Sequence, residues 1–318
     1  MDKVSAIGYE PDQADEPDCE AGRLLTMLMD TLDRILKPFH RLLASSGQKC
    51  LTCGRITSLS REYLGICRTC YMSIPWITRP RCIYCGRQIG CPDCTREQAG
   101  PWHFVCNRSA ATYNADMREW LAQYKYRGNE AYAPLLISML ERAYRQLQQE
   151  IAKKQQISFH KTGQAAEVQW QAHMITSVPV SLERLKERGF NQAEVLARGL
   201  AAAVKLPYAE LLQRDRHTHK QSFKSRMDRL KDMEGVFRSL PEAAEVIELL
   251  ATSIYSRTKA LKSINSAMAD APFSLRILLI DDIYTTGSTI NACSQELKIA
   301  GETQGIPVEI FSLTWARS

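Results

Sequence analysis

The sequence lacks two features of exported and membrane proteins. No run approaches the roughly 18 uncharged apolar residues that a membrane-spanning helix needs. Residues 1–20 are acidic and lack the basic and then apolar order of a secretion signal. The excess of positive over negative residues is also small, since the net charge is only +6 over 318 residues. This mild excess permits an anionic ligand or nucleic acid without requiring either. We therefore expect a cytoplasmic globular protein.

Cysteine, in contrast, is abundant, with 11 residues. In a reducing compartment, clustered thiols usually bind metal rather than form disulfides. Eight of the 11 form four C-x2-C pairs: Cys50 and Cys53, Cys67 and Cys70, Cys82 and Cys85, and Cys91 and Cys94. Two such pairs complete a tetrahedral site of four thiolates. We therefore expect two Zn²⁺ ions with a structural role.

Two ways of sharing the thiols between the ions are open. Sequential pairing, which we favour, joins the first two pairs on one ion and the last two on the other, as in a double zinc ribbon. An interleaved arrangement is the alternative, and spacing alone does not decide. A redox role is weaker, because repeated pairs imply scaffolding. The region has few apolar residues, so zinc removal should unfold it. Three cysteines outside the pairs are expected to be buried or incidental: Cys19, Cys106 and Cys293.

A second motif lies near the end of the chain. Residues 277–280 are an apolar run that predicts a buried parallel strand. Asp281 and Asp282 follow at its carboxyl end, where open α/β sheets bind ligands. Next comes a loop of hydroxyls and glycine that opens a helix: Thr285, Thr286, Gly287, Ser288 and Thr289. Such a loop suits a phosphate, whereas the carboxylates would contact ribose hydroxyls or water around Mg²⁺. This order predicts a sugar-phosphate site.

The remaining pattern alternates strands and helices, which is typical of an α/β fold. Strands are expected at 110–113, 174–180 and 308–313, and helices at 115–126, 132–151, 192–204, 246–254 and 290–300, the last ending at Gly301 as its C-cap. A basic turn with Arg184, Lys186 and Arg188 follows the strand at 174–180 and suits an anion. Residues 152–171 and 241–274 read as added segments that could form a lid or a partner surface.

Two further segments have open interpretations. Residues 25–43 carry an amphipathic helical stripe, which either docks on the body of the protein or binds a partner or a membrane surface. Residues 214–238 carry eight Lys or Arg against four acids. They form either a solvated charged surface or a loop that closes over a phosphate-bearing substrate.

Together these motifs resemble the ComF family, whose members pair a zinc ribbon with a type I phosphoribosyltransferase domain. The resemblance rests on the cysteine array, on Tyr124–Gly128 and Arg188–Gln192, and on the loop at 281–289, which looks like the phosphoribosyl pyrophosphate (PRPP) loop of that enzyme class. It implies a twisted parallel sheet flanked by helices, with a small N-terminal double zinc ribbon. The implied domains are a tail with an amphipathic helix at 1–48, the ribbon at 49–107 and the phosphoribosyltransferase-like domain at 108–318.

The resemblance also implies roles for the motif residues. Asp281 and Asp282 would hold the ribose 2′ and 3′ hydroxyls of PRPP, and residues 285–289 would bind its 5′-phosphate. Arg184 and Arg188 would meet the pyrophosphate, with Mg²⁺ bridging its oxygens. Catalysis would then rest on positioning and on stabilising the departing pyrophosphate. Lys125 and Arg226 are candidates for further anion contacts, although we expect each to be a surface cation.

For the whole protein, the resemblance implies a phosphoribosyltransferase-like role in DNA uptake during natural competence. Implied partners are PRPP, single-stranded DNA and a DNA-uptake helicase, with Arg226, Arg229 and Lys231 as candidate DNA contacts. The alternative is a non-enzymatic adaptor that senses PRPP, or a regulator that binds nucleic acid. No motif identifies the acceptor molecule or the oligomeric state.

Overall fold

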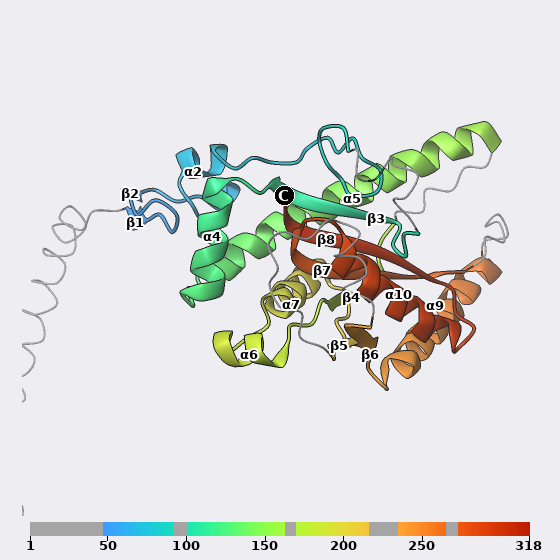
Figure 1. Ribbon diagram of the computed structural model, residues 1–318. Coiled ribbons are helices and arrows are strands. Elements are labelled where there is room, and N and C mark those ends of the chain that lie inside the picture. Colours follow the sequence, from blue (N-terminus) through green and yellow to red (C-terminus); the bar gives the residue numbers. More distant parts are fainter. Residues whose placement is uncertain (1–46, 92–93, 95–100, 163–169, 216–234, 265–272) are drawn as a thin grey trace, which may run out of the picture.

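The computed structural model describes residues 47–91, 94, 101–162, 170–215, 235–264 and 273–318 (Figure 1). Among these residues, no helix is both long and apolar enough to cross a membrane. The expected acidic tail and the amphipathic helix at 25–43 lie outside the described residues, as do Cys19, Arg226, Arg229 and Lys231.

A parallel sheet of four strands forms the centre of the molecule, in the order β3-β8-β7-β4. Its strands are β3 (Cys106–Thr112), β4 (Met174–Ser177), β7 (Leu275–Tyr284) and β8 (Val308–Arg317). β7 and β8 are apolar on both faces, as strands covered by helices on both sides should be. Their pairing runs from Leu275 opposite Val308 to Tyr284 opposite Arg317.

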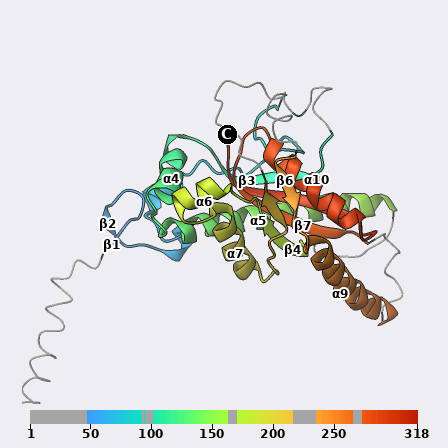
Figure 2. The ribbon, with the colours of Figure 1, turned by 60° about the horizontal axis from the view of Figure 1, so that its bottom comes forward.

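Helices cover both faces of this sheet (Figure 2). On one face, α5 (Tyr132–Thr162) and α7 (Gln192–Val204) pack on the strands, with α4 (Ala115–Tyr126) against α5. Leu278 and Ile280 of β7 enter this core. On the other face lie α10 (Ser288–Glu302) and, against it, α9 (Ala243–Ile264); Ile277 and Leu279 enter that core. The alternation along β7 thus builds two separate buried clusters.

Smaller elements surround the sheet. The cysteine-rich region contains the hairpin of β1 (Gln48–Lys49) and β2 (Ile56–Thr57), the 3₁₀-helix η1 (Arg61–Tyr63) and α2 (Arg68–Met72). A second hairpin, β5 (Leu212–Arg214) with β6 (Phe237–Ser239), packs against α10. The short helix α6 (Leu182–Arg188) follows β4.

The predicted fold class is confirmed: a parallel sheet lies between helices and two cysteine groups precede it. The basic turn at 184–188, however, is the helix α6, which Ser181 caps at its start and Gly189 ends in a left-handed conformation. Helix α5 continues to Thr162, into the predicted excursion at 152–171. The division into three domains stays a prediction.

Gly301 is not the C-cap of α10, because the helix continues through it to Glu302. A Cβ at Gly301 would overlap the Val308 side chain and lie 2.7 Å from the Ile306 carbonyl oxygen. Glycine is therefore needed there for the close return of the chain into β8. The left-handed residue of this connection is Gly305, with φ of +65°.

Candidate functional site: a paired-aspartate loop and two cysteine groups

The predicted sugar-phosphate site lies where β7 meets α10. Asp281 and Asp282 are in the last part of β7, which continues to Tyr284. Residues 285–287 form the loop, and α10 begins at Ser288. The loop is ordered internally by a 3.0 Å hydrogen bond between the hydroxyls of Thr286 and Ser288. The sheet edge, the acid pair and the hydroxyl loop are therefore brought together as the sequence predicts.

Gly287 shapes this loop. Its φ of +83° is in the left-handed region, and an added Cβ would overlap the Tyr284 ring, 2.6 Å from Cζ. The backbone can therefore turn closely over Tyr284 only without a side chain.

The start of α10 is open to an anion. Asn114, Ser181 and Asn191 cap α4, α6 and α7 with side-chain hydrogen bonds. Gly287, at the same position of α10, offers no side chain, and the first turn of α10 has no acidic residue. Free N–H groups at a helix start carry a partial positive charge and bind phosphates well.

The two aspartates differ from ordinary surface carboxylates. Asp281 accepts a 2.8 Å hydrogen bond from the backbone N–H of Asp282. Burial, followed by the neighbouring charge of Asp282, raises the pKa of Asp281 from 3.8 to about 7, although Lys125 and Arg214 oppose the shift. A carboxylate that is costly to ionise here gains most from a ligand that brings hydroxyl donors or a cation.

Lys125 of α4 belongs to this site and is not the surface cation that we expected. Its ammonium forms an ion pair with the Asp282 carboxylate, and the two side chains are only 12% and 18% exposed. The motif at 124–128 thus contacts the acid pair through Lys125 at the end of α4. Spacing along the chain carries no sign of this contact, because 157 residues separate its partners.

Among the predicted pyrophosphate contacts, the two arginines of α6 differ in their surroundings. Arg188 is held by Gln192 at 2.8 Å and by the Tyr126 hydroxyl at 3.4 Å, with its guanidinium 5.0 Å from the centre of the Tyr126 ring. Arg184 lies close enough to Arg214 of β5 for its charge to affect that guanidinium. Burial first, and then the charge of Arg184, lower the pKa of Arg214, while Asp281 opposes the shift.

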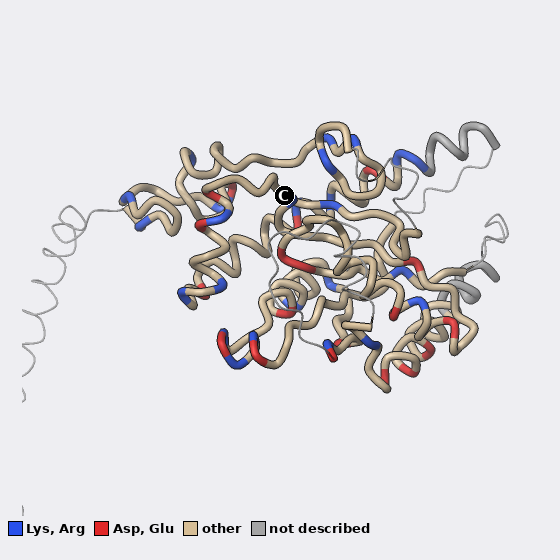
Figure 3. Tube along the Cα trace, viewed as in Figure 1, with Lys and Arg blue, Asp and Glu red and all other residues tan. Residues whose placement is uncertain are grey.

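Arg214 is therefore a residue that our sequence analysis did not assign to the site, although it begins the basic segment at 214–238. Basic and acidic residues are interspersed over most of the described chain (Figure 3). The grouping of Arg184, Arg214 and Lys125 around two aspartates comes from the fold.

The first cysteine group confirms sequential pairing. Four thiol sulfurs, from two C-x2-C pairs, lie within 4.8 Å of one another: Cys50, Cys53, Cys67 and Cys70. Gly54 directly follows the first pair with φ of +74°, as the knuckle turn requires. Cys50 and Cys67 are buried in the cluster that contains α4 and α5, and the Tyr132 hydroxyl of α5 donates a 3.2 Å hydrogen bond to the Leu51 carbonyl.

The second group consists of four buried thiols, again within 4.8 Å of one another: Cys82, Cys85, Cys91 and Cys94. A hydrogen bond with the Cys94 thiol, and then the charge of Arg317, lower the pKa of Cys85 to about 4 despite its burial. Four thiols without a competing ligand type fit a closed tetrahedral zinc site in each group. Both sets of donors thus fit structural zinc.

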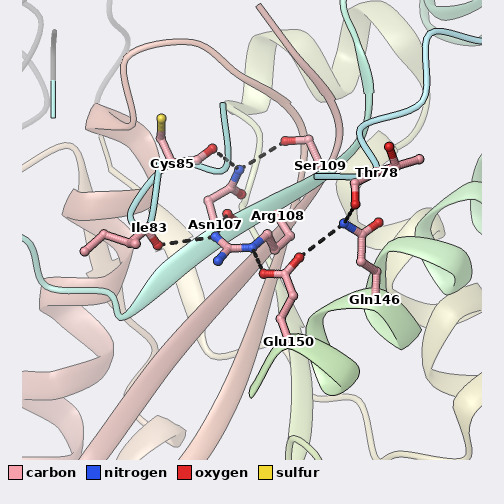
Figure 4. A network of polar contacts seen from close by, with 8 residues as sticks. All are labelled: Thr78, Ile83, Cys85, Asn107, Arg108, Ser109, Gln146 and Glu150. Carbon is pink, nitrogen blue, oxygen red and sulfur yellow. Dashed lines mark hydrogen bonds and ion pairs between the residues drawn. The ribbon is translucent and has the colours of Figure 1, made fainter. Parts of the chain in front are cut away.

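Strand β3 fixes the second group to the sheet (Figure 4). The backbone N–H of Asn107 donates to the Tyr84 carbonyl at 2.7 Å, and its side-chain amide donates to the Cys85 carbonyl at 3.4 Å. Arg108 donates to the Ile83 carbonyl at 3.3 Å and pairs with Glu150 of α5 at 2.7 Å. Backbone carbonyls on both sides of Tyr84 are thereby held by one strand.

No family model matches the chain. Three curated proteins do, each at 27% identity. Competence protein ComFC of Streptococcus pneumoniae matches over 281 residues, 83% of this chain and 99% of that protein. Competence protein ComFC of Bacillus subtilis matches over 249 residues, 76% of this chain and 81% of that protein. Competence protein F of Haemophilus influenzae matches over 127 residues, 39% of this chain and 44% of that protein.

These matches extend beyond the motifs, since two of them cover most of this chain and most of each relative. Together with the cysteine groups and the parallel sheet, they confirm the resemblance of this chain to the ComF family.

Proposed function

We propose that this protein binds PRPP at the end of β7 and acts as a phosphoribosyltransferase-type protein in DNA uptake during competence. The observation that carries the proposal is the junction of β7 and α10. There, an acid pair precedes a glycine-dependent loop whose helix start has no side-chain cap. A ligand with ribose hydroxyls next to a terminal phosphate matches both halves of this junction.

In this proposal, different residues of the site bind different parts of PRPP. The amides and hydroxyls of 285–289 bind the 5′-phosphate, and Asp281 and Asp282 accept hydrogen bonds from the ribose hydroxyls. Arg184, with Arg214 nearby, neutralises the pyrophosphate, and Arg188 supports it from α6. Mg²⁺ would enter with PRPP and supply further neutralisation of the leaving pyrophosphate. Transfer of the ribosyl group would then depend on positioning and on charge stabilisation.

Lys125 has a specific role in this proposal. Without a ligand, it neutralises Asp282. When ribose hydroxyls or Mg²⁺ reach the acid pair, the ammonium becomes available to a ligand anion. Lys125 would thereby neutralise Asp282 before the ligand binds and contact the ligand anion afterwards.

The competence role rests on the relatives, two of which carry the name Competence protein ComFC. We extend that role to this chain, with a DNA-uptake helicase as its partner, because two of the matches cover 83% and 76% of this chain.

Calorimetric titration with PRPP and Mg²⁺ tests the binding proposal. The wild type should bind, and Asp281→Asn/Asp282→Asn should lose about tenfold or more in affinity, since two charged hydrogen-bond acceptors are removed. Asp116→Asn, which changes an exposed carboxylate at the start of α4, is the matched control and should bind as the wild type does. Absence of wild-type binding, or equal affinity in the double variant, contradicts the site.

Pyrophosphate release separates an enzyme from a PRPP sensor. The wild type is incubated with Mg²⁺ and PRPP in the presence of a panel of nucleobases and amines. Release that depends on one acceptor and disappears in the double variant supports transfer. Intact PRPP binding with a silent panel favours the alternative, a non-enzymatic adaptor.

Single-stranded DNA binding is the proposal for the basic segment, which lies between Arg214 of β5 and Arg238 of β6 on neighbouring strands. Affinity should fall steeply as salt rises, because bound cations release counterions from DNA. Replacing Arg226, Arg229 and Lys231 by Ala should reduce the slope by about 2 in log–log units. A fluorescence anisotropy titration at several salt concentrations measures this, and a flat wild-type response would remove DNA from the account.

A further inference from the structure

One buried arginine touches both the second cysteine group and the predicted phosphate loop. Arg317 is the last residue of β8, and only 5% of it is exposed. Its Nη2 lies 3.6 Å from the Cys85 sulfur. Its Nη1 donates to the Thr285 carbonyl at 3.1 Å and to the Tyr284 carbonyl at 3.5 Å. The two ends of one guanidinium group therefore join a metal-ligand candidate to the first residue of the loop.

The surroundings hold this arginine in one orientation. Its guanidinium lies 4.9 Å from the centre of the Tyr284 ring, the ring that Gly287 approaches closely. Backbone hydrogen bonds fix both sides: the N–H of Ser318 donates to the Tyr284 carbonyl at 3.0 Å, and the N–H of Tyr113 donates to the Arg317 carbonyl at 2.8 Å. Phe104, which packs in the same cluster as the second cysteine group, contacts the Tyr284 ring edge-on.

We propose that Arg317 is a positioning residue that couples metal binding at the second cysteine group to the shape of the phosphate loop. This inference rests on the proposed PRPP site for its functional consequence. Four thiolates around Zn²⁺ carry a net negative charge, which stabilises a buried guanidinium beside them. Loss of the metal removes the bond that fixes the Cys85 sulfur beside this guanidinium, so Arg317 loses a fixed partner on one side while it still holds Thr285 on the other.

The coupling must act in both directions. If metal at the second group favours the loop geometry that binds phosphate, bound phosphate must tighten metal binding at that group by the same free energy. The first cysteine group serves as an internal comparison. Arg142 donates to the hydroxyl of Tyr71, the residue after Cys70, at 2.9 Å, and its guanidinium lies 4.4 Å from the centre of the Trp76 ring.

The test compares the zinc-loaded full chain with Arg317→Gln, Arg317→Lys and the matched control Arg142→Gln. Hydrogen exchange of peptides covering 284–292 is measured without ligand. Zinc release to a chromogenic chelator is measured with and without PRPP and Mg²⁺. We expect Arg317→Gln to raise loop exchange about tenfold and Arg317→Lys to raise it less, with no change in Arg142→Gln. PRPP should slow the release of one of the two zinc ions in the wild type but not in Arg317→Gln.

The outcomes separate this inference from the proposed function. Unchanged loop exchange in a folded Arg317→Gln overturns the inference, whether or not PRPP binds. Raised exchange together with no PRPP binding supports the link and refutes the PRPP site. If Arg317→Gln does not fold, wild-type zinc release decides: PRPP that binds without slowing either zinc contradicts the coupling.

Discussion

At the scale of single residues, the site is a balance of partly buried charges. Asp281 is costly to ionise, whereas the ammonium of Lys125 neutralises its neighbour Asp282. Arg214 lies near enough to both Arg184 and Asp281 to respond to their charges. A ligand that carries hydroxyls, a divalent cation and phosphates can satisfy all of these groups together, which is the physical basis of the PRPP proposal.

The raised pKa of Asp281 predicts that the stability of the protein depends on pH. Because its pKa in the folded protein is about 7 rather than 3.8, the folded state binds a proton that the unfolded state has released. Stability should therefore fall as pH rises from about 4 to 7, and stay low above that window. Asp281→Asn removes this dependence while its side-chain oxygen can still accept the Asp282 N–H.

Urea unfolding at pH 5 and pH 8 measures the effect. Between these two values, the wild type should lose on the order of 2 kcal/mol more stability than Asp281→Asn. Other titrating groups are common to both proteins and cancel in the comparison. Equal pH dependence in the two proteins would mean that Asp281 is not the buried acid described above.

At the residue scale, the sequence predicted the acid pair, the hydroxyl loop and the eight clustered thiols, since each set is contiguous or regularly spaced. It named Lys125 as a candidate anion contact but favoured a surface cation there, and it assigned neither Arg214 nor Arg317 to the site. Each of these comes from another strand or helix, and a lone cation has no local pattern that distinguishes it from a surface residue.

At the scale of elements, the junction of β7 and α10 depends on one glycine. The apolar run at 277–280 identifies β7 from sequence, residues 308–313 were expected as the strand that became β8, and the helices of the core follow from 3.6-residue periodicity. The predicted ends of the helices were less accurate. Residues 184–188 were expected as a turn but form α6, and α5 was expected to end near residue 151 but continues to Thr162. Caps such as Ser181, and close packing such as that at Gly301, decide these ends and depend on tertiary contacts.

Gly287→Ala tests the junction. The new methyl group would overlap the Tyr284 ring and force a left-handed alanine, so the loop must shift. PRPP affinity should fall about tenfold or more, because the amides of the helix start lose their alignment. Gly305→Ala is the control: its φ is also positive, at +65°, but the added carbon has nothing within 4 Å.

Both variants should lose about 1 kcal/mol of stability from the backbone strain, with a further loss in Gly287→Ala from the overlap. Thermal unfolding measures the stability and calorimetry measures the affinity. If Gly305→Ala weakens PRPP binding as much as Gly287→Ala does, the effect is general strain rather than the shape of the loop.

At the scale of the whole molecule, the two cysteine groups join different buried clusters. Cys50 and Cys67 pack in the cluster with α4 and α5, whereas the second group packs in the cluster with Phe104, Tyr284 and α10. The sequence predicted both groups from spacing, but their packing in different buried clusters is a property of the fold. Metal in each group should therefore stabilise a different part of the protein.

Zinc content tests this arrangement. Purified reduced protein should contain two zinc ions per chain by elemental analysis, and Cys50→Ser or Cys85→Ser should each contain one. Hydrogen exchange should then rise around α4 in Cys50→Ser and around 284–292 in Cys85→Ser. Loss of both ions in either variant would show that the groups do not bind independently.

A crystal of the protein soaked with PRPP and Mg²⁺ addresses the site directly. We predict density for the 5′-phosphate at the backbone amides of 286–289, with the ribose hydroxyls on Asp281 and Asp282 and the pyrophosphate toward Arg184. Density for PRPP elsewhere on the protein, or a phosphate bound with the two aspartates turned away from the sugar, would contradict the account.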